Sequence, residues 1–127
     1  MWDGDIERDD SMTELIYEEL HPHSRDEISM MLISKDVNSR IKGILVASLF
    51  DPDSKWATDV CINALKNDDL DVKIAALTGL SHIVRIHGTL ELQAVTDLLR
   101  KMKTISELQG PISDLMDDID IFLQNRD

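Results

Sequence analysis

The sequence has 127 residues, of which 43% are hydrophobic and only 4% are aromatic. This length suits a single domain over 1–127, and a chain rich in Leu, Ala and Met favours helices over sheets. Its 25 acidic and 13 basic residues give a net charge of −12, which argues against nucleic acid and anionic membranes as direct partners and leaves two interpretations, attraction to a basic protein or solubility alone.

The start of the chain is acidic and poor in apolar groups over residues 1–11, so we expect a frayed tail there. A short helix is predicted over 12–20, with Leu15, Ile16 and Leu20 at helical spacing. The first residues lack the basic start of a secretory signal, and no stretch approaches the ~20 apolar residues of a membrane span. We therefore expect a cytoplasmic protein.

Cap and breaker signals divide the rest of the chain into helices. Ser24 and Glu27 have the spacing of a capping box. Asp51, which precedes a proline, predicts a helix start, and Asp71 is expected to cap a long helix that ends at Gly88. No segment shows a strand pattern. The helices predicted after residue 20 span about 24–34, 37–50, 52–67, 71–87, 90–103 and 110–123.

Two segments of the chain repeat one another. Arg40–Ile44 aligns with Lys73–Leu77 at an offset of 33 residues, and an acidic turn precedes each segment. A period in the thirties with two helices per repeat is typical of a helical solenoid, in which each pair buries its apolar face on its neighbours. The predicted fold is therefore all-α, a short α-solenoid of about three antiparallel helix pairs. The pairs are predicted over about 24–50, 52–88 and 90–123, with core positions at Trp56, Leu65, Leu77, Leu80, Ile83 and Leu115.

The second helix of the central pair carries a family signature. Asn67–Leu77 combines an acidic turn, a Val, a basic residue and small residues, and it resembles the second helix of a HEAT repeat. Gly79–Gly88 and Asp117–Leu123 are similar to segments of small bacterial HEAT-like proteins, some of which resemble immunity proteins of contact-dependent growth inhibition and other polymorphic toxin systems. The resemblance extends over about residues 37–123 and implies a protein that binds a toxin.

Catalytic and metal-binding patterns are weak, so we expect no catalytic residue, no metal and no cofactor. His82 and His87 are five residues apart and do not share a helix face as metal ligands at i and i+4 would. The chain has no His-Glu dipeptide, by which HEAT-like metal hydroxylases are recognised, and no phosphate-binding loop. A HEAT-like lyase or hydroxylase is the enzyme alternative.

A stripe on the long central helix is left over once its apolar face is assigned to the core. In a solenoid the second helices of successive pairs line one side, so residues of the first and third pairs would extend this surface. The other interpretation is a solvated stripe without function, continued by an acidic face on the last helix. The predicted partner-binding residues are Asn38, Lys42, Asp71, Thr78, His82, Arg85, Asp114, Asp117 and Asp118.

Size, charge and resemblance together lead to one functional expectation. We expect an immunity protein that binds a cognate toxin domain, a basic nuclease, and neutralises it by covering its active site. The chain would be a monomer that enters a heterodimeric complex with the toxin. The alternative is a HEAT-like adaptor with an unrelated protein partner.

Overall fold

The computed structural model describes residues 20–67 and 69–123, and every regular element in these ranges is helical. The predicted tail 1–11 and the predicted helix 12–20, apart from Leu20, lie outside the described residues, and Leu20 itself is not helical. The all-α prediction is thus confirmed for the described part of the chain. The elements are α2 (Arg25–Leu32), α3 (Val37–Phe50), α4 (Ser54–Leu65), α5 (Leu70–His87), α6 (Leu92–Lys101), the 3₁₀ turn η1 (Ser106–Leu108) and α7 (Gln109–Phe122).

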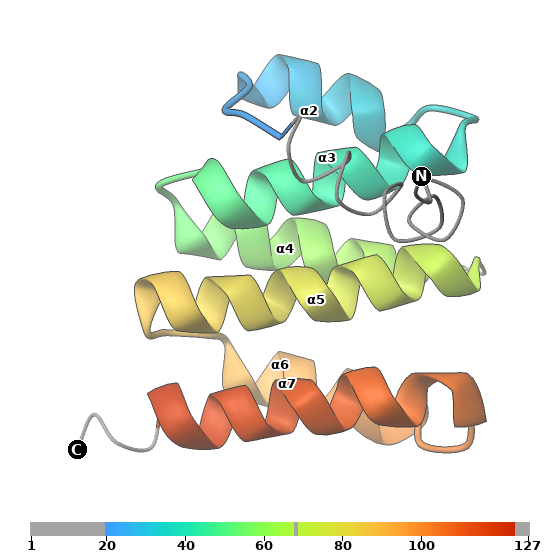
Figure 1. The fold of residues 1–127 in the computed structure, drawn as a ribbon, viewed down its shortest axis with the longest axis vertical. Coiled ribbons are helices and arrows are strands. Elements are labelled where there is room, and N and C mark those ends of the chain that lie inside the picture. Colours follow the sequence, from blue (N-terminus) through green and yellow to red (C-terminus); the bar gives the residue numbers. More distant parts are fainter. Residues whose placement is uncertain (1–19, 68, 124–127) are drawn as a thin grey trace, which may run out of the picture.

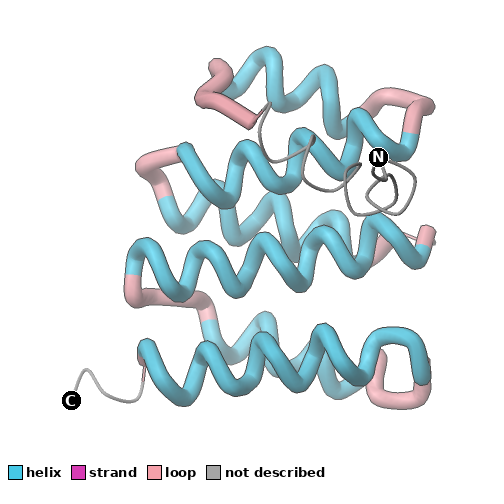
Figure 2. Tube along the Cα trace, in the orientation of Figure 1, coloured by secondary structure: helices cyan, strands magenta, loops and turns pink. Residues whose placement is uncertain are grey.

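The helices form three antiparallel pairs, which are stacked with α2 at one end and α7 at the other (Figures 1 and 2). α3, α5 and α7 run side by side in the same direction, and α4 and α6 lie behind them (Figure 1). α5 packs against α3 on one side and against α7 on the other, so it is the central helix of the stack. This arrangement confirms the predicted short solenoid of helix pairs.

The turn before α3 is held by two polar contacts. Asp36 caps α3, and its backbone N–H donates to Ser34 Oγ at 3.1 Å. Arg40 donates from Nη1 to the carbonyl oxygen of Ser34, also at 3.1 Å. The cation therefore satisfies a backbone acceptor just beyond the end of the preceding helix.

The turn before α5 repeats these contacts 33 residues later in the sequence. Asp69 caps α5, and its N–H donates to Asn67 Oδ1 at 2.8 Å. Lys73 Nζ donates to the carbonyl oxygen of Leu65 at 2.9 Å and to that of Asn67. The repeat seen in the sequence is thus also a repeat of hydrogen bonds, in which Asn67, Asp69 and Lys73 correspond to Ser34, Asp36 and Arg40.

The turn before α7 keeps this geometry without the charge. Gln109 Nε2 donates to the carbonyl oxygens of Lys103 at 2.7 Å and Ile105 at 3.0 Å. Lys103 precedes Gln109 by six residues, the same separation as between Ser34 and Arg40. α7 has no side-chain cap and follows directly on η1. The last pair is therefore the least regular, as expected of a terminal repeat.

Two predicted helix caps are wrong by two residues. α4 is capped by Asp53 rather than by Asp51, whose carboxylate accepts a hydrogen bond from Arg25 of α2 at 3.0 Å. α5 is capped by Asp69 rather than by Asp71. Both turns contain several acidic residues close together in the sequence, and any of these residues was chemically suitable as the cap.

Two other cap predictions are confirmed. Ser24 Oγ accepts the N–H of Glu27 at 3.1 Å, and the Glu27 carboxylate accepts the N–H of Ser24 at 2.9 Å, which completes a capping box. Gly88 ends α5 with a φ of 66°, in the left-handed region that glycine adopts without a steric penalty.

The core lies between the two layers of helices and surrounds α5. Trp56 differs from the prediction, since it is only partly buried at the edge of the core, where the Arg25 guanidinium lies 4.6 Å from its ring centroid. Ala75 lies between Asp71 and Thr78 at helical spacing along the predicted stripe, but it is only 6% exposed and packs in the core. The other predicted core positions are buried, namely Leu65, Leu77, Leu80, Ile83 and Leu115.

Candidate partner-binding groove between α5 and α7

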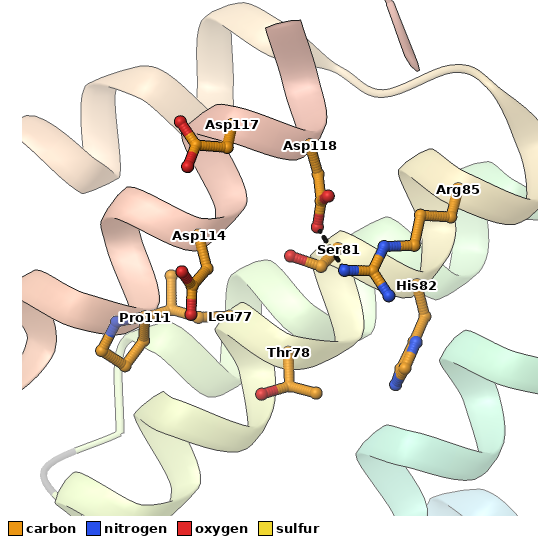
Figure 3. A pocket seen from close by; sticks show the side chains of 9 residues that line it. All are labelled: Leu77, Thr78, Ser81, His82, Arg85, Pro111, Asp114, Asp117 and Asp118. Atoms are coloured by element: carbon orange, nitrogen blue, oxygen red, sulfur yellow. Dashed lines mark ion pairs between the residues drawn. The ribbon is translucent and has the colours of Figure 1, made fainter. Parts of the chain in front are cut away.

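A groove with a volume of about 350 Å³ lies between α5 and α7 (Figure 3). Both of its walls are helices, so a rigid backbone holds the Cα atoms of the lining residues in place. All the binding residues predicted on α5 and α7, except Asp71, line it. The lining residues are Leu77, Thr78, Ser81, His82 and Arg85 from α5, and Pro111, Asp114, Asp117 and Asp118 from α7.

The α5 wall carries polar side chains above an apolar floor. Thr78, Ser81 and Arg85 are three and four residues apart, a spacing that places them on one helix face. Leu77 is fully buried and Ser81 is 8% exposed, whereas Arg85 is exposed at the rim. The α5 wall is therefore apolar at its base, carries hydroxyl groups above the base and ends in a cation at the rim.

The α7 wall is acidic. Asp114 and Asp117 are exposed, but Asp118 is only 6% exposed. Asp118 lies next to Ile119 and three residues after Leu115, both of which pack in the core, and this rotation of α7 turns the Asp118 carboxylate toward α5. Asp118 therefore does not belong to the solvated acidic face that the sequence suggested.

Arg85 and Asp118 join the two walls. Arg85 Nη2 lies 3.1 Å from Asp118 Oδ2, and Figure 3 marks this ion pair with a dashed line. The Asp118 side chain is 9% exposed and the Arg85 side chain is 52% exposed. Asp118 Oδ2 has no hydrogen-bond partner among the described residues, so its contact with Arg85 brings opposite charges together without hydrogen-bond geometry. A buried carboxylate with so few donors is unusual, since its burial is costly.

The surroundings of His82 in this groove favour its neutral form. Burial lowers its pKa, the neighbouring Arg85 cation lowers it further, and the Asp118 carboxylate opposes both effects. With His82 neutral, the charged groups of the lining are the carboxylates of Asp114, Asp117 and Asp118 and one guanidinium. The groove therefore carries a net negative charge. Across 20–67 and 69–123, no group of three or more His, Cys, Asp or Glu side chains is placed to hold a metal ion.

Three predicted binding residues lie outside the groove. Asn38 is exposed in the first turn of α3, and Lys42 is partly buried one turn later. Asp71 is exposed in the first turn of α5. None of the three lines the groove, which is bounded only by the later turns of α5 and by α7.

Three lining residues were not predicted from the sequence. Ser81 follows Thr78 by three residues and precedes Arg85 by four, so the helical spacing of the predicted stripe already contained a signal for it. Leu77 and Pro111 reach the groove only because α7 packs on α5. No local pattern in the sequence marks that packing.

No protein-family model, curated protein or solved structure matches this chain. Within the described ranges, none of the helices combines the length and the apolar character needed to cross a bilayer. The function is therefore inferred from the geometry and charge of the groove.

Proposed function

We propose that this chain is a non-catalytic immunity protein, which binds a basic toxin domain and covers its active site. The α5–α7 groove would form part of the contact surface. The observation that carries the proposal is the acidic wall of this groove, because Asp114 and Asp117 are exposed and form no ion pair with another described residue. Unpaired carboxylates on a rigid helix are suited to a cationic surface.

Electrostatics explain why an acidic cover would inhibit such a toxin. A nuclease holds the phosphate backbone with basic side chains, so its substrate groove is positively charged. A chain with a net charge of −12 is attracted to that groove over long range, which raises the association rate. Occupation of the groove then excludes the substrate without any chemical step. The expected complex contains one copy of each protein.

The test begins with the product of the neighbouring gene as the candidate toxin. Co-expression should yield a one-to-one complex, and the association rate should fall steeply as salt rises from about 0.1 M to about 1 M. Over that range the Debye length shortens from about 10 Å to about 3 Å. The dissociation rate should change less. No complex, or an association rate that is independent of salt, would reject the proposal.

Matched charge reversals locate the contact surface. Asp114→Lys with Asp117→Lys should lower the association rate several-fold, because both residues are exposed on the groove wall. Asp26→Lys with Asp59→Lys makes the same change in net charge at exposed positions on α2 and α4 and should have a smaller effect. Equal effects would mean that only the overall charge matters and would remove the groove from the interface.

A further inference from the structure

We propose that the groove binds one arginine side chain of the protein partner, and that Arg85 takes the place of that arginine at Asp118 in the free protein. This inference rests on the proposed function and names the chemical group that the groove recognises. In the ion pair between the walls, a guanidinium already lies 3.1 Å from the buried carboxylate.

Asp118 is the part of the groove that points to a ligand. Its residue is 6% exposed, and its Oδ2 atom has no hydrogen-bond partner among the described residues. Figure 3 shows the carboxylate directed across the groove toward α5. A buried carboxylate oxygen with unused acceptor capacity gains most from a donor that carries a positive charge.

The rest of the lining matches an arginine side chain along its length. A guanidinium has five N–H donors and therefore needs several acceptors, whereas an ammonium is a compact charge with three donors. The carboxylates of Asp114 and Asp118 and the hydroxyl of Ser81 supply such acceptors within one groove. Pro111 provides apolar surface for the methylene groups of the stem.

Arg85 is suited to leave when the partner binds. Its side chain is 52% exposed, and its ion pair with a described residue joins one of its nitrogen atoms to one oxygen of Asp118. A half-exposed cation regains water when it moves away, so the exchange costs little. The incoming arginine would then complete the hydrogen bonds that Asp118 lacks in the free protein.

The experiment uses the full chain and a capped pentapeptide, acetyl-Ala-Ala-Arg-Ala-Ala-amide. The control peptide carries citrulline, which has nearly the shape of arginine but no charge. Amide chemical shifts should move at Thr78, Ser81 and Asp118 with the arginine peptide and not with the citrulline peptide. Shifts that are equal for both peptides, or that lie outside the groove, would overturn the inference.

Substitutions of Arg85 and of Asp118 should have opposite effects on the affinity for the arginine peptide. Arg85→Gln should tighten binding of the arginine peptide, because the internal competitor is removed. Asp118→Asn should weaken binding by about tenfold, the effect of losing one charge-assisted hydrogen bond. Asp59→Asn, an exposed position on α4, makes the same charge change and should leave binding unaltered. Weaker or unchanged binding by Arg85→Gln would refute the exchange.

A second variant and the toxin complex itself separate this inference from the proposed function. If Asp118→Asn does not fold, Asp114→Asn tests the same wall at an exposed residue and should also weaken binding. Complex formation with the toxin that is insensitive to both Arg85→Gln and Asp118→Asn would overturn this inference while the proposed function stands. Specific binding of the arginine peptide without any toxin complex would overturn the proposed function instead.

Discussion

Gly79 of α5 lies directly against Ser48 of α3, with no room for a side chain between them. A Cβ atom at Gly79 would lie 2.8 Å from the Sγ of Cys61 and closer still to Ser48 Oγ. Ser48 and Cys61 contact each other at 3.3 Å, and Ser48 Oγ also donates to the Ile44 carbonyl oxygen at 2.8 Å. Three helices therefore meet at this one glycine.

Gly79→Ala should destabilise the protein by about 1–3 kcal/mol, the usual cost of overpacking a core. Ser48→Ala in the same chain should recover part of the loss, because it removes the nearest atom. Gly110→Ala is the matched control, since a Cβ atom at Gly110 would have nothing within 4 Å. Urea unfolding measures all three variants. A Gly79→Ala protein as stable as Gly110→Ala would contradict the close contact.

Leu80→Ala should cost about 2–5 kcal/mol of unfolding free energy, because it leaves a cavity in a well-packed core. Leu80 is fully buried on α5, whereas Leu92 on α6 is 41% exposed. Leu92→Ala should therefore change stability much less. Denaturant midpoints at constant slope give the comparison. Similar losses at the two positions would show that the core face of α5 is misplaced.

Lys73→Met should destabilise the protein by about 2 kcal/mol, because it removes charged hydrogen bonds to the end of α4. Lys73→Arg should retain most of the stability, since Arg40 makes the corresponding contact before α3. Gln109→Met should cost less than Lys73→Met, because the amide it removes is neutral. Thermal unfolding would rank the three variants, and the reverse order would contradict the equivalence of these turns.

Stability should fall in acid partly through His82. Since its pKa is lowered in the folded protein, the unfolded chain binds more protons at this ring once the pH drops below about 6.5. The stability that neutral His82 contributes is fully present above that pH, and it is lost as the pH falls from about 6.5 toward the pKa of His82 in the folded protein. His82→Gln should flatten the stability profile in this window. Parallel profiles for the two proteins would exclude the effect.

The thiol of Cys61 should resist alkylation in the native protein. Burial raises its pKa to about 12, against the opposing contact with Ser48, so almost no thiolate is present at pH 8. Iodoacetamide should label Cys61 only in denaturant. Rapid stoichiometric labelling of the folded chain at pH 8 would show that the interface between α3, α4 and α5 opens readily.

Local signals in the sequence were sufficient where one short segment decides the structure. The capping box of Ser24 and Glu27 and the end of α5 at Gly88 depend only on neighbours a few residues away. The choice between Asp51 and Asp53 is different. Arg25 contacts both carboxylates from 26 and 28 residues away in the sequence, and the Asp51 side chain is 7% exposed whereas that of Asp53 is 50% exposed. Burial and contacts with a distant helix have no local pattern in the sequence.

The groove was predictable in part for the same reason. Helical spacing placed Thr78, His82 and Arg85 on one face of α5, and it grouped the aspartates of α7. The burial of Asp118 depends on the rotation of α7 against α5, which only packing determines. The same packing ends the groove before it reaches Asn38 on α3.

The close contact of Gly79 with Ser48 also limits how the stack could be lengthened by duplication of a repeat. A second copy of residues 34–66, inserted before Asn67, would set a copied α3 against the original one. The position equivalent to Gly79, 33 residues earlier, is Val46, whose side chain is fully buried. That branched side chain would meet Ser48 where only a hydrogen atom fits, so a lengthened chain needs a glycine at this position of the copy. The turns that repeat along the stack could therefore replace one another, whereas the contacts between neighbouring helices could not.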